Sequence, residues 1–262
     1  MVVSTLPQLW EGRYLRAEDW SQAYDSIADA MVKNLRLSGR RCRILEVGAG
    51  RGQLTVPLAR MIPREWWLYT VDSYQGPYRR DFRVLKRVLR SEKLMTRVIP
   101  LVGDARNPSR FGDGSFDIIV SNELFCELKR PELTMASKGF FRVLKKGGRM
   151  AHGNLSPTPR SSSQRLLIEM DSSPKWSTSP ARGGWFSPTP TEVASIFHET
   201  GFTALRTILV KMNIHYRGEE AMQQLRIWHA RPSFLRKHSR TIGRRGLDIP
   251  PEYITFCRKP KT

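Results

Sequence analysis

The sequence predicts an α/β fold: a Rossmann-like, doubly wound sheet of seven strands, mostly parallel, with an antiparallel final strand pair. Short apolar runs alternate with stretches of helical periodicity, as in parallel strands joined by right-handed crossovers. A glycine-rich turn between residues 48 and 52 follows the first apolar run. The chain has 262 residues, 40% of them hydrophobic. This size suits one core, so we expect a single domain over residues 1–262.

An N-terminal helical extension, residues 1–40, precedes the sheet. Apolar side chains recur at helical spacing over residues 17–36, which predicts a helix there. Its apolar face comprises Trp20, Tyr24, Ile27, Met31 and Leu35. This helix leads into the core.

The strands are expected to follow at regular intervals. The first, around residues 44–47, runs into the glycine turn and then into a second helix. Four more are expected at residues 67–72, 98–102, 116–121 and 148–155, with helices between them. After a helix over residues 191–201, ended by Gly201, come a long strand over residues 202–214 and a last strand over residues 252–259. These last two need no helical crossover if they are antiparallel.

Two segments depart from this alternation. Residues 156–190 are rich in Ser and Pro and contain Trp176, Trp185 and Phe186. They predict a long loop with one short helix around residues 161–170, and loops of that length are often lids or binding loops. Residues 216–250 form a basic insertion between the last two strands.

The charge and the cysteine content indicate what kind of partner the protein binds and in which compartment it works. Lys and Arg number 44 against 24 Asp and Glu, a formal net charge of +20 that favours a polyanionic partner. No apolar run approaches the roughly 18 residues of a spanning helix, and the N-terminus does not resemble a secretory signal. Cys42, Cys126 and Cys257 are widely spaced and odd in number. We therefore expect a cytoplasmic protein without a membrane partner, with its cysteines in the core.

Polar groups accumulate where the predicted strands end. Gly48, Gly50 and Gly52 permit a sharp turn and close approach to a ligand, but Gln53 replaces the third small residue of the dinucleotide fingerprint. Asp72 ends the second strand, where a carboxylate can accept hydrogen bonds from both hydroxyls of a ribose. The third and fourth strands end in Gly103 and Asp104 and in Ser121, Asn122 and Glu123. Open α/β sheets bind ligands at this edge.

Taken in order, these residues resemble the class I, S-adenosylmethionine-dependent methyltransferase family over roughly residues 40–260. The matching segments are ILEVGAGRG for the first motif, VDSY for the ribose-binding acid, GDA for the adenine-binding turn, FFRVLKKGGRM for the helix and turn before the fifth strand, and YITFCRKP for the last strand. The resemblance implies that S-adenosylmethionine is the methyl donor and S-adenosylhomocysteine the product.

The resemblance also implies roles for individual residues. Glu46 and the three glycines would line the methionine end of the cofactor, Asp72 and Ser73 would hold the ribose, and Asp104 and Ala105 would meet the adenine. Ser121 and Asn122 complete the predicted cofactor site, and Asn122 and Glu123 would face the methyl group as the candidate catalytic residues. For Glu46 and Asp104 the alternative is turn capping, and for Asp72 a solvated strand end.

The sequence says less about the molecule that accepts the methyl group. The family's amino-methylating nucleic-acid enzymes often carry two prolines and an aromatic residue after an Asn or Asp, whereas Asn122 is followed here by Glu-Leu-Phe. Cys126 lies a helical turn beyond the position of a cytosine-methylating nucleophile and is interpreted as core. Asn122 and Glu123 suit either catalysis or helix capping.

Basic residues cluster in two places that favour RNA as the partner. A helix just after Asp72 carries a charged stripe that includes Arg79, Arg80 and Arg83, continued by Lys86, Arg87 and Arg90. The second cluster has no acidic residue, is interleaved with Trp228, His229, Phe234 and His238, and comprises Arg226, Arg231, Arg236, Lys237, Arg240, Arg244 and Arg245. Such a composition suits phosphates and stacked bases, although a solvated face is the alternative.

We therefore predict an RNA methyltransferase that acts on RNA or a ribosomal subunit, with ribosomal RNA and a base nitrogen favoured. Two alternatives remain open: a small-molecule or protein methyltransferase, and a catalytically idle protein that binds the cofactor and RNA.

Overall fold

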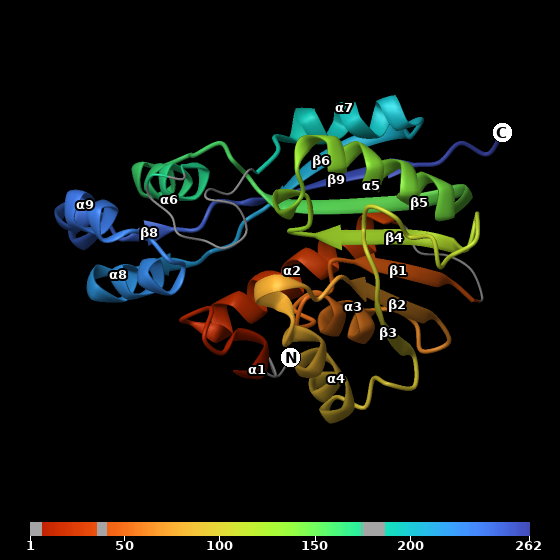
Figure 1. The fold of residues 1–262 in the computed structure, drawn as a ribbon, viewed down its shortest axis with the longest axis horizontal. Helices are drawn as coiled ribbons and strands as arrows, with labels where there is room; N and C mark the ends of the chain where they lie inside the picture. Colours follow the sequence, from red (N-terminus) through yellow and green to blue (C-terminus); the bar gives the residue numbers. More distant parts are fainter. Residues whose placement is uncertain (1–6, 36–40, 174, 176–186) are drawn as a thin grey trace.

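A computed structural model describes residues 7–35, 41–173, 175 and 187–262. Seven strands form one sheet in the order β3-β2-β1-β4-β5-β9-β6 (Figure 1). β9 is antiparallel to both of its neighbours, and β1 to β5 pair in parallel. The predicted fold class is confirmed. The strands are β1 Arg43–Val47, β2 Trp67–Asp72, β3 Val98–Val102, β4 Phe116–Asn122, β5 Leu144–Leu155, β6 Thr203–Val210 and β9 Glu252–Arg258.

Helices cover both faces of the sheet, which explains why its central strands are apolar on both sides. α2 (Ala17–Leu35), α3 (Thr55–Met61) and α4 (Asp81–Ser91) lie on one face, and α5 (Arg130–Val143) and α7 (Pro190–Thr200) lie on the other (Figure 1). α2 matches the helix expected over residues 17–36. α7 ends as predicted at Gly201, whose φ of 105° is the left-handed conformation that favours glycine.

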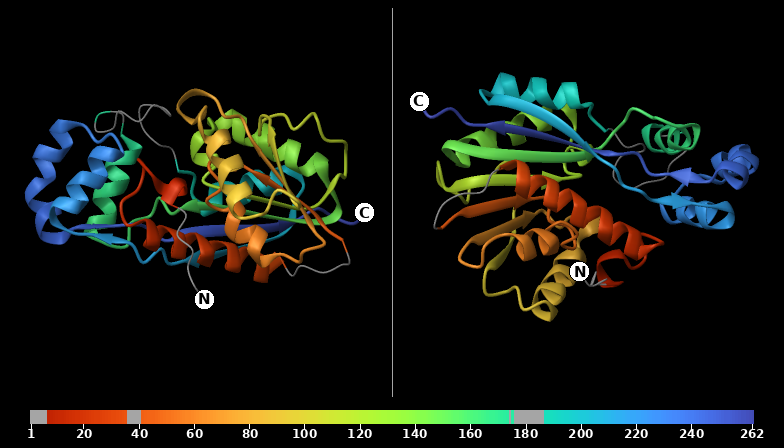
Figure 2. Two further views of the ribbon diagram at one scale, coloured as in Figure 1. Left: turned by 90° about the horizontal axis from the view of Figure 1, so that it is seen from below. Right: turned by 180° about the vertical axis from the view of Figure 1, so that it is seen from behind.

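A small helical group lies beyond the carboxyl ends of the parallel strands, on the side opposite the C-terminus (Figure 2). It contains α6 (Ser162–Ser172), α8 (Gly218–Ile227) and α9 (Pro232–Arg245), and β7 (His215–Tyr216) pairs with β8 (Leu247–Asp248) at its base. α6 confirms the short helix expected around residues 161–170. Trp176, Trp185 and Phe186 lie outside the described residues. The remaining short elements are α1 Pro7–Trp10, η1 Gly76–Tyr78 and η2 Phe125–Glu127.

Two predicted boundaries were wrong. The strand expected over residues 202–214 pairs with β9 only as far as Val210, because β9 begins at Glu252 and has no residue opposite the later positions. The segment FFRVLKKGGRM is not all helix and turn: α5 ends at Val143 and β5 begins at Leu144.

The parallel register brings the ends of the central strands to one edge. Val47 of β1 lies between Val71 of β2 and Ser121 of β4, so the residues that follow these three share that edge. All three cysteines are buried and free, as predicted. Among the described residues, no helix combines the length and apolar character needed to cross a membrane.

Candidate active site

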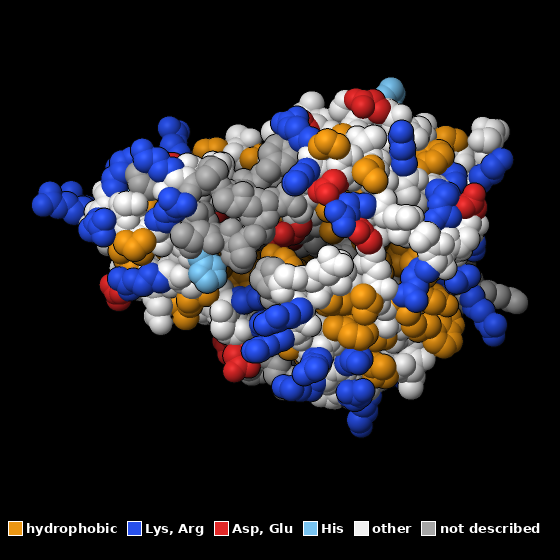
Figure 3. Space-filling view, in the orientation of Figure 1, with side chains coloured by type: hydrophobic (Ala, Val, Ile, Leu, Met, Phe, Trp, Pro, Cys, Tyr) orange, Lys and Arg blue, Asp and Glu red, His pale blue; other side chains and the backbone are white. Residues whose placement is uncertain are grey.

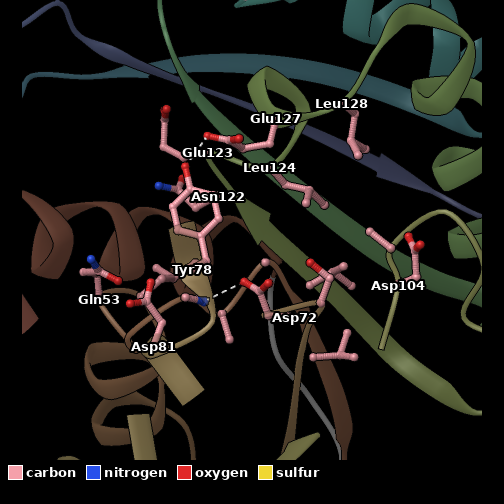
Figure 4. A pocket seen from close by; sticks show the side chains of 18 of the residues that line it. Gln53, Asp72, Tyr78, Asp81, Asp104, Asn122, Glu123, Leu124, Glu127 and Leu128 are labelled. Atoms are coloured by element: carbon pink, nitrogen blue, oxygen red, sulfur yellow. Dashed lines mark hydrogen bonds between the residues drawn. The ribbon is translucent and has the colours of Figure 1, made fainter. Parts of the chain in front are cut away.

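A cavity of about 520 Å³ opens at the carboxyl edge of the sheet (Figure 4), within the range typical of ligand pockets. The glycine turn and the ends of β2, β3 and β4 form one half of its wall. The other half comes from α2, from the two short 3₁₀ helices η1 and η2, and from the N-terminal segment, which we define as residues 9–16. The lining includes Arg13, Tyr14, Tyr24, Gly48, Gly50, Gln53, Asp72, Ser73, Tyr78, Asp81, Asp104, Ala105, Arg106, Asn122, Glu123, Leu124, Glu127, Leu128, Lys129 and Glu132.

The glycine turn presents bare backbone to the cavity. Gly48 and Gly50 line it, with φ values of 87° and 52° that favour glycine. A Cβ at Gly48 would come within 3.3 Å of the Leu124 Cβ. Gly52 does not line the cavity; a Cβ there would lie 2.8 Å from Leu85 Cδ1, so its role is close packing against α4.

Asp72 stands at the centre of this half. Its carboxylate accepts the amide of Gly50 at 2.9 Å and that of Tyr74 at 3.2 Å. Burial raises the pKa of Asp72, while these amide hydrogen bonds act in the opposite direction. Each carboxylate oxygen has a further lone pair, so Asp72 can accept two hydroxyl groups from a ligand. Ser73 lines the cavity beside it.

Asp104 and Ala105 also line the cavity, but Asp104 is engaged by its neighbour. The Arg106 guanidinium donates to both Asp104 oxygens and reaches Glu132 at 2.8 Å. These bonds lower the pKa of Asp104. A ligand amino group at Asp104 must therefore share the carboxylate with Arg106.

Two predicted site residues lie behind the cavity wall. Glu46 is buried and accepts a hydrogen bond from Thr55 Oγ1 at 2.6 Å, and burial raises the pKa of Glu46 to about 8. Ser121 Oγ lies 2.8 Å from His152 Nδ1, and burial lowers the pKa of His152 to about 3. In this structure, Glu46 and Ser121 brace the strands that carry the site.

Neither candidate catalytic residue caps a helix, so that alternative was wrong. Asn122 ends β4, and Glu123 follows with a φ of 50° that a side chain rarely adopts. The Glu123 amide donates to the Gly153 carbonyl at 3.0 Å, and its Oε1 accepts the Leu155 amide at 2.5 Å. These bonds hold Glu123 at the cavity wall, where burial raises its pKa to about 7.

The far half of the wall contains residues that the sequence analysis missed. Arg13 and Tyr14 enter from the N-terminal segment, and Tyr78 donates to Glu127 at 2.9 Å across the opening (Figure 4). Tyr24 was predicted to lie on the core face of its helix, but it also lines the cavity. Its hydroxyl group was the only sequence feature that could have indicated this. For Arg13 no sequence signal was available, because only the fold brings it to the sheet edge.

The predicted RNA-binding residues lie outside the cavity. Arg79, Arg80 and Arg83 are exposed at the start of α4, and Lys and Arg side chains lie around the central hollow in which acidic side chains are visible (Figure 3). In the second cluster, Arg226 pairs with Glu219, Lys237 lies 3.6 Å from Glu169, and Arg245 donates to Ser162. All seven basic residues of that cluster are exposed.

The aromatic residues of that cluster do not form a stacking surface. Phe234 is fully buried, His238 packs on it, and Trp228 joins Tyr14, Trp20 and Tyr216 in an aromatic contact group. Their assignment to base stacking was wrong, because α8 and α9 use them to pack onto the rest of the molecule. The exposed His229 is the exception.

The residues present fit a sulfonium nucleoside. Two glycines without Cβ atoms allow close approach, and Asp72 has free lone pairs for ribose hydroxyls. The apolar side chains of Leu124 and Leu128 flank the space beyond Asp72 where a planar base would lie (Figure 4), and Ala105 also lines the cavity.

Comparison with known proteins supports the same interpretation. Residues 44–148 match the family model described as a methyltransferase domain. No curated protein sequence matches the chain. Among solved structures, the YcgJ protein from Bacillus subtilis has a TM-score of 0.64 at 16% identity, covering 90% of this chain and 98% of that one. A geranyl diphosphate methyltransferase in complex with SAM has a TM-score of 0.58 at 13% identity, covering 90% and 85%. The [4+2]-cyclase SpnF has a TM-score of 0.61 at 19% identity, covering 92% and 82%. These likenesses show the fold.

Proposed function

We propose that this chain is a class I S-adenosylmethionine-dependent methyltransferase, because residues 44–148 match a methyltransferase-domain model and the sheet has the fold expected of that family, and that its acceptor is a small molecule enclosed in the far half of the cavity. The cofactor supplies a methyl group on a positively charged sulfur, which is already activated for transfer. The protein therefore has to bind, orient and shield the acceptor more than it has to activate it.

The observation that carries this proposal is the charge of the cavity wall. On a chain of net charge +20, six carboxylates line the cavity against three basic side chains. Two of those basic side chains are paired inside the wall, Arg13 with Asp81 and Arg106 with Asp104. An acidic compartment repels a phosphate-bearing polymer and suits a neutral or cationic small molecule.

The enclosure of this compartment supports the same conclusion. The N-terminal segment crosses it and is fastened at several points: the Gln224 side chain accepts the Leu15 amide at 2.6 Å and donates to the Arg13 carbonyl at 3.0 Å. Arg51 from the glycine turn reaches the Glu11 carbonyl at 2.6 Å. Tyr14 is thereby held over the acceptor space, where its ring limits the size of what can enter.

The test is methyl transfer to separated cell fractions. Purified protein is incubated with methyl-labelled S-adenosylmethionine and with the low-mass metabolites, the protein or the RNA of a cell extract. We expect label in the low-mass fraction, and we expect Asp72→Ala to reduce it. Label confined to the RNA or to the protein fraction would overturn the proposal.

A second candidate is methylation of RNA, with structured ribosomal RNA and a base nitrogen as the specific form. It is favoured by Arg79, Arg80 and Arg83, which are exposed near the cavity and have no ion-pair partner among the described residues. Neutralising several phosphates makes binding fall steeply with salt. RNA binding with that salt dependence, lost when Arg79, Arg83 and Arg236 are changed to Glu together with loss of RNA methylation, would establish this candidate over the first.

We also propose a reducing, cytoplasmic setting. Cys42, Cys126 and Cys257 are buried as free thiols, and burial raises the pKa of all three. Raised pKa values keep thiols protonated and slow their oxidation. Recovery of the unmodified thiols by mass spectrometry from native cells tests this setting.

A further inference from the structure

The carboxyl groups of Glu123 and Glu252 lie behind the far wall of the cavity without a basic partner, and Asp171 is near enough to Glu123 to feel its charge. Glu123 follows β4, Asp171 is near the end of α6, and Glu252 begins β9. Glu252 is 0% exposed, and neither of its carboxylate oxygens makes a well-formed hydrogen bond, although the Asn122 amide lies beside them. We call these three residues, together with Asn122, the acidic cluster.

Asn122 connects the cluster to the cavity. Its side chain lines the cavity although the residue is only 7% exposed, and neither its amide oxygen nor its amide nitrogen makes a well-formed hydrogen bond. A buried amide left unpaired lowers the stability of the folded protein. An unpaired amide at the wall of a cavity is accordingly explained by a ligand that completes its hydrogen bonds.

The sheet explains why these groups meet. Asn122 pairs with Gly153 across β4 and β5, and Glu252 pairs with Leu155 across β5 and β9. A Cβ at position 153 would overlap both Asn122 Oδ1 and Glu252 Oε1. Gly153 therefore leaves the space in which the Asn122 amide and the Glu252 carboxyl lie side by side.

The surroundings of the cluster are acidic or neutral. Burial, and then the charge of Glu123, raise the pKa of Glu252 well above its usual range, while the Asn122 amide acts in the opposite direction. Burial and the Glu123 charge also raise the pKa of Asp171 to about 8. The other titratable groups that face the cluster are Tyr14, Tyr24, Cys126, Glu127 and Tyr253. Throughout the described ranges, none of the three carboxyl groups has an ion pair with Lys, Arg or His.

A structural role explains this arrangement poorly. A buried carboxyl group that is not paired is costly, and an amide or apolar side chain of the same size would be cheaper. No three His, Cys, Asp or Glu side chains of the described residues are placed to share a metal ion. An organic cation satisfies both the charge and the unpaired amide.

We propose that the acidic cluster binds the basic nitrogen of the acceptor, so that the enzyme is an amine N-methyltransferase. This inference rests on the proposed small-molecule function and specifies its substrate class. The Asn122 oxygen would accept one N–H, and the positive charge of a bound ammonium would lower the pKa values of Glu252 and Asp171, so that their ionised forms balance that charge.

The group transfer then balances as follows. The ammonium gives one proton to the Glu123 carboxylate, which exposes the nitrogen lone pair. That pair forms the new N–C bond as the C–S bond of the donor breaks, and the sulfur keeps the electron pair of the broken bond. The positive charge passes from sulfur to nitrogen, and the proton on Glu123 leaves to solvent.

The test compares benzylamine with its neutral isostere benzyl alcohol, by ligand-observed NMR on the protein saturated with S-adenosylhomocysteine. We expect the amine to bind at least about tenfold more tightly than the alcohol. Glu252→Gln, Asp171→Asn and Asn122→Ala should each reduce that preference several-fold. Glu219→Gln, a glutamate exposed on α8 and remote from the cavity, is the matched control and should leave the preference unchanged.

Affinity for S-adenosylhomocysteine, measured by calorimetry, should be unchanged in Glu252→Gln and Asp171→Asn, which shows that these variants are folded. Equal binding of amine and alcohol, or a preference that survives both substitutions, overturns the inference. Its failure is distinct from that of the proposed function: label on oxygen, carbon or sulfur of a low-mass compound refutes only the amine, whereas label confined to RNA refutes the small-molecule acceptor itself.

Discussion

The two halves of the cavity differ in how their polar groups are paired. We call the half formed by the glycine turn and the ends of β2 and β3 the cofactor half, and the far half, with the acidic cluster behind it, the acceptor half. In the cofactor half, Asp72 accepts two backbone amides and Asp104 is held by Arg106. In the acceptor half, Asn122 and Glu252 have no well-formed hydrogen bonds. Under the proposed function, the cofactor half is thus built in advance and the acceptor half is completed by its ligand.

This difference has an energetic meaning. Groups that already have internal partners keep their geometry when a ligand arrives, so binding costs little reorganisation. Groups without partners lower the stability of the empty protein and recover that free energy only when the matching ligand binds. Substitutions in the two halves should therefore separate cofactor affinity from acceptor affinity and from stability.

The largest effect is expected from removing the clamp on the N-terminal segment. Gln224→Leu leaves the part-buried Leu15 amide without its partner, at about 1–3 kcal/mol, whereas the Arg13 carbonyl keeps the Trp228 indole N–H as a donor. We expect a loss of stability of that size in chemical denaturation. We also expect methyl transfer to fall more than cofactor affinity. Gln224→Glu keeps the acceptor atom for Leu15 and should restore part of the stability; equal damage from both variants would contradict the clamp.

Asp72→Ala tests the cofactor half directly. Loss of a charged acceptor for two hydroxyls should weaken cofactor binding by about 1.5–3 kcal/mol, or roughly tenfold to a hundredfold. Calorimetry with S-adenosylhomocysteine measures this effect. An unchanged dissociation constant would remove Asp72 from the cofactor site.

Glu123→Gln tests the acceptor half through the dependence of stability on pH. The pKa of Glu123 is raised to about 7 in the folded protein, so the folded state favours the protonated carboxyl. The wild type should therefore lose stability as the pH rises from about 4.5 to 7, on the order of 2 kcal/mol. The Gln variant lacks this term and should be the more stable protein at pH 8 while transferring methyl groups more slowly. Parallel stability–pH curves for the two proteins would refute the assignment.

The smallest effect is expected at the outer surface. Arg236→Glu and Arg240→Glu change exposed side chains of α9, and such changes usually alter stability by less than about 0.5 kcal/mol. Cofactor affinity and amine preference should stay at wild-type values. A change in either would show that α9 acts on the cavity.

The sequence was sufficient for the fold and for the meeting of Gly50, Asp72 and Asp104 at one cavity, because both depend on local patterns. Glycines, a strand and a terminal acid recur in a fixed order, and parallel strands bring their ends together. The acceptor half depends on long-range contacts. Arg13 reaches the cavity through ties to Asp81 and Gln224, and Glu252 reaches it through the register of an antiparallel strand.

In the basic cluster of α8 and α9, the sequence pattern led to a wrong prediction. Its composition suggested stacked bases, but Phe234 and Trp228 serve packing. An aromatic residue between arginines on a helix can face either way, and only the packing of α8 against α9 decides between them.

The direction of β9 has a consequence for how the sequence of this protein can diversify. Because β9 runs against its neighbours, the segment between β6 and β9 leaves and rejoins the sheet at the same edge. The segment between β6 and β9 can therefore change in length or sequence without moving the strands that position Gly50 and Asp72. New acceptor preferences could thus evolve on an unaltered donor platform.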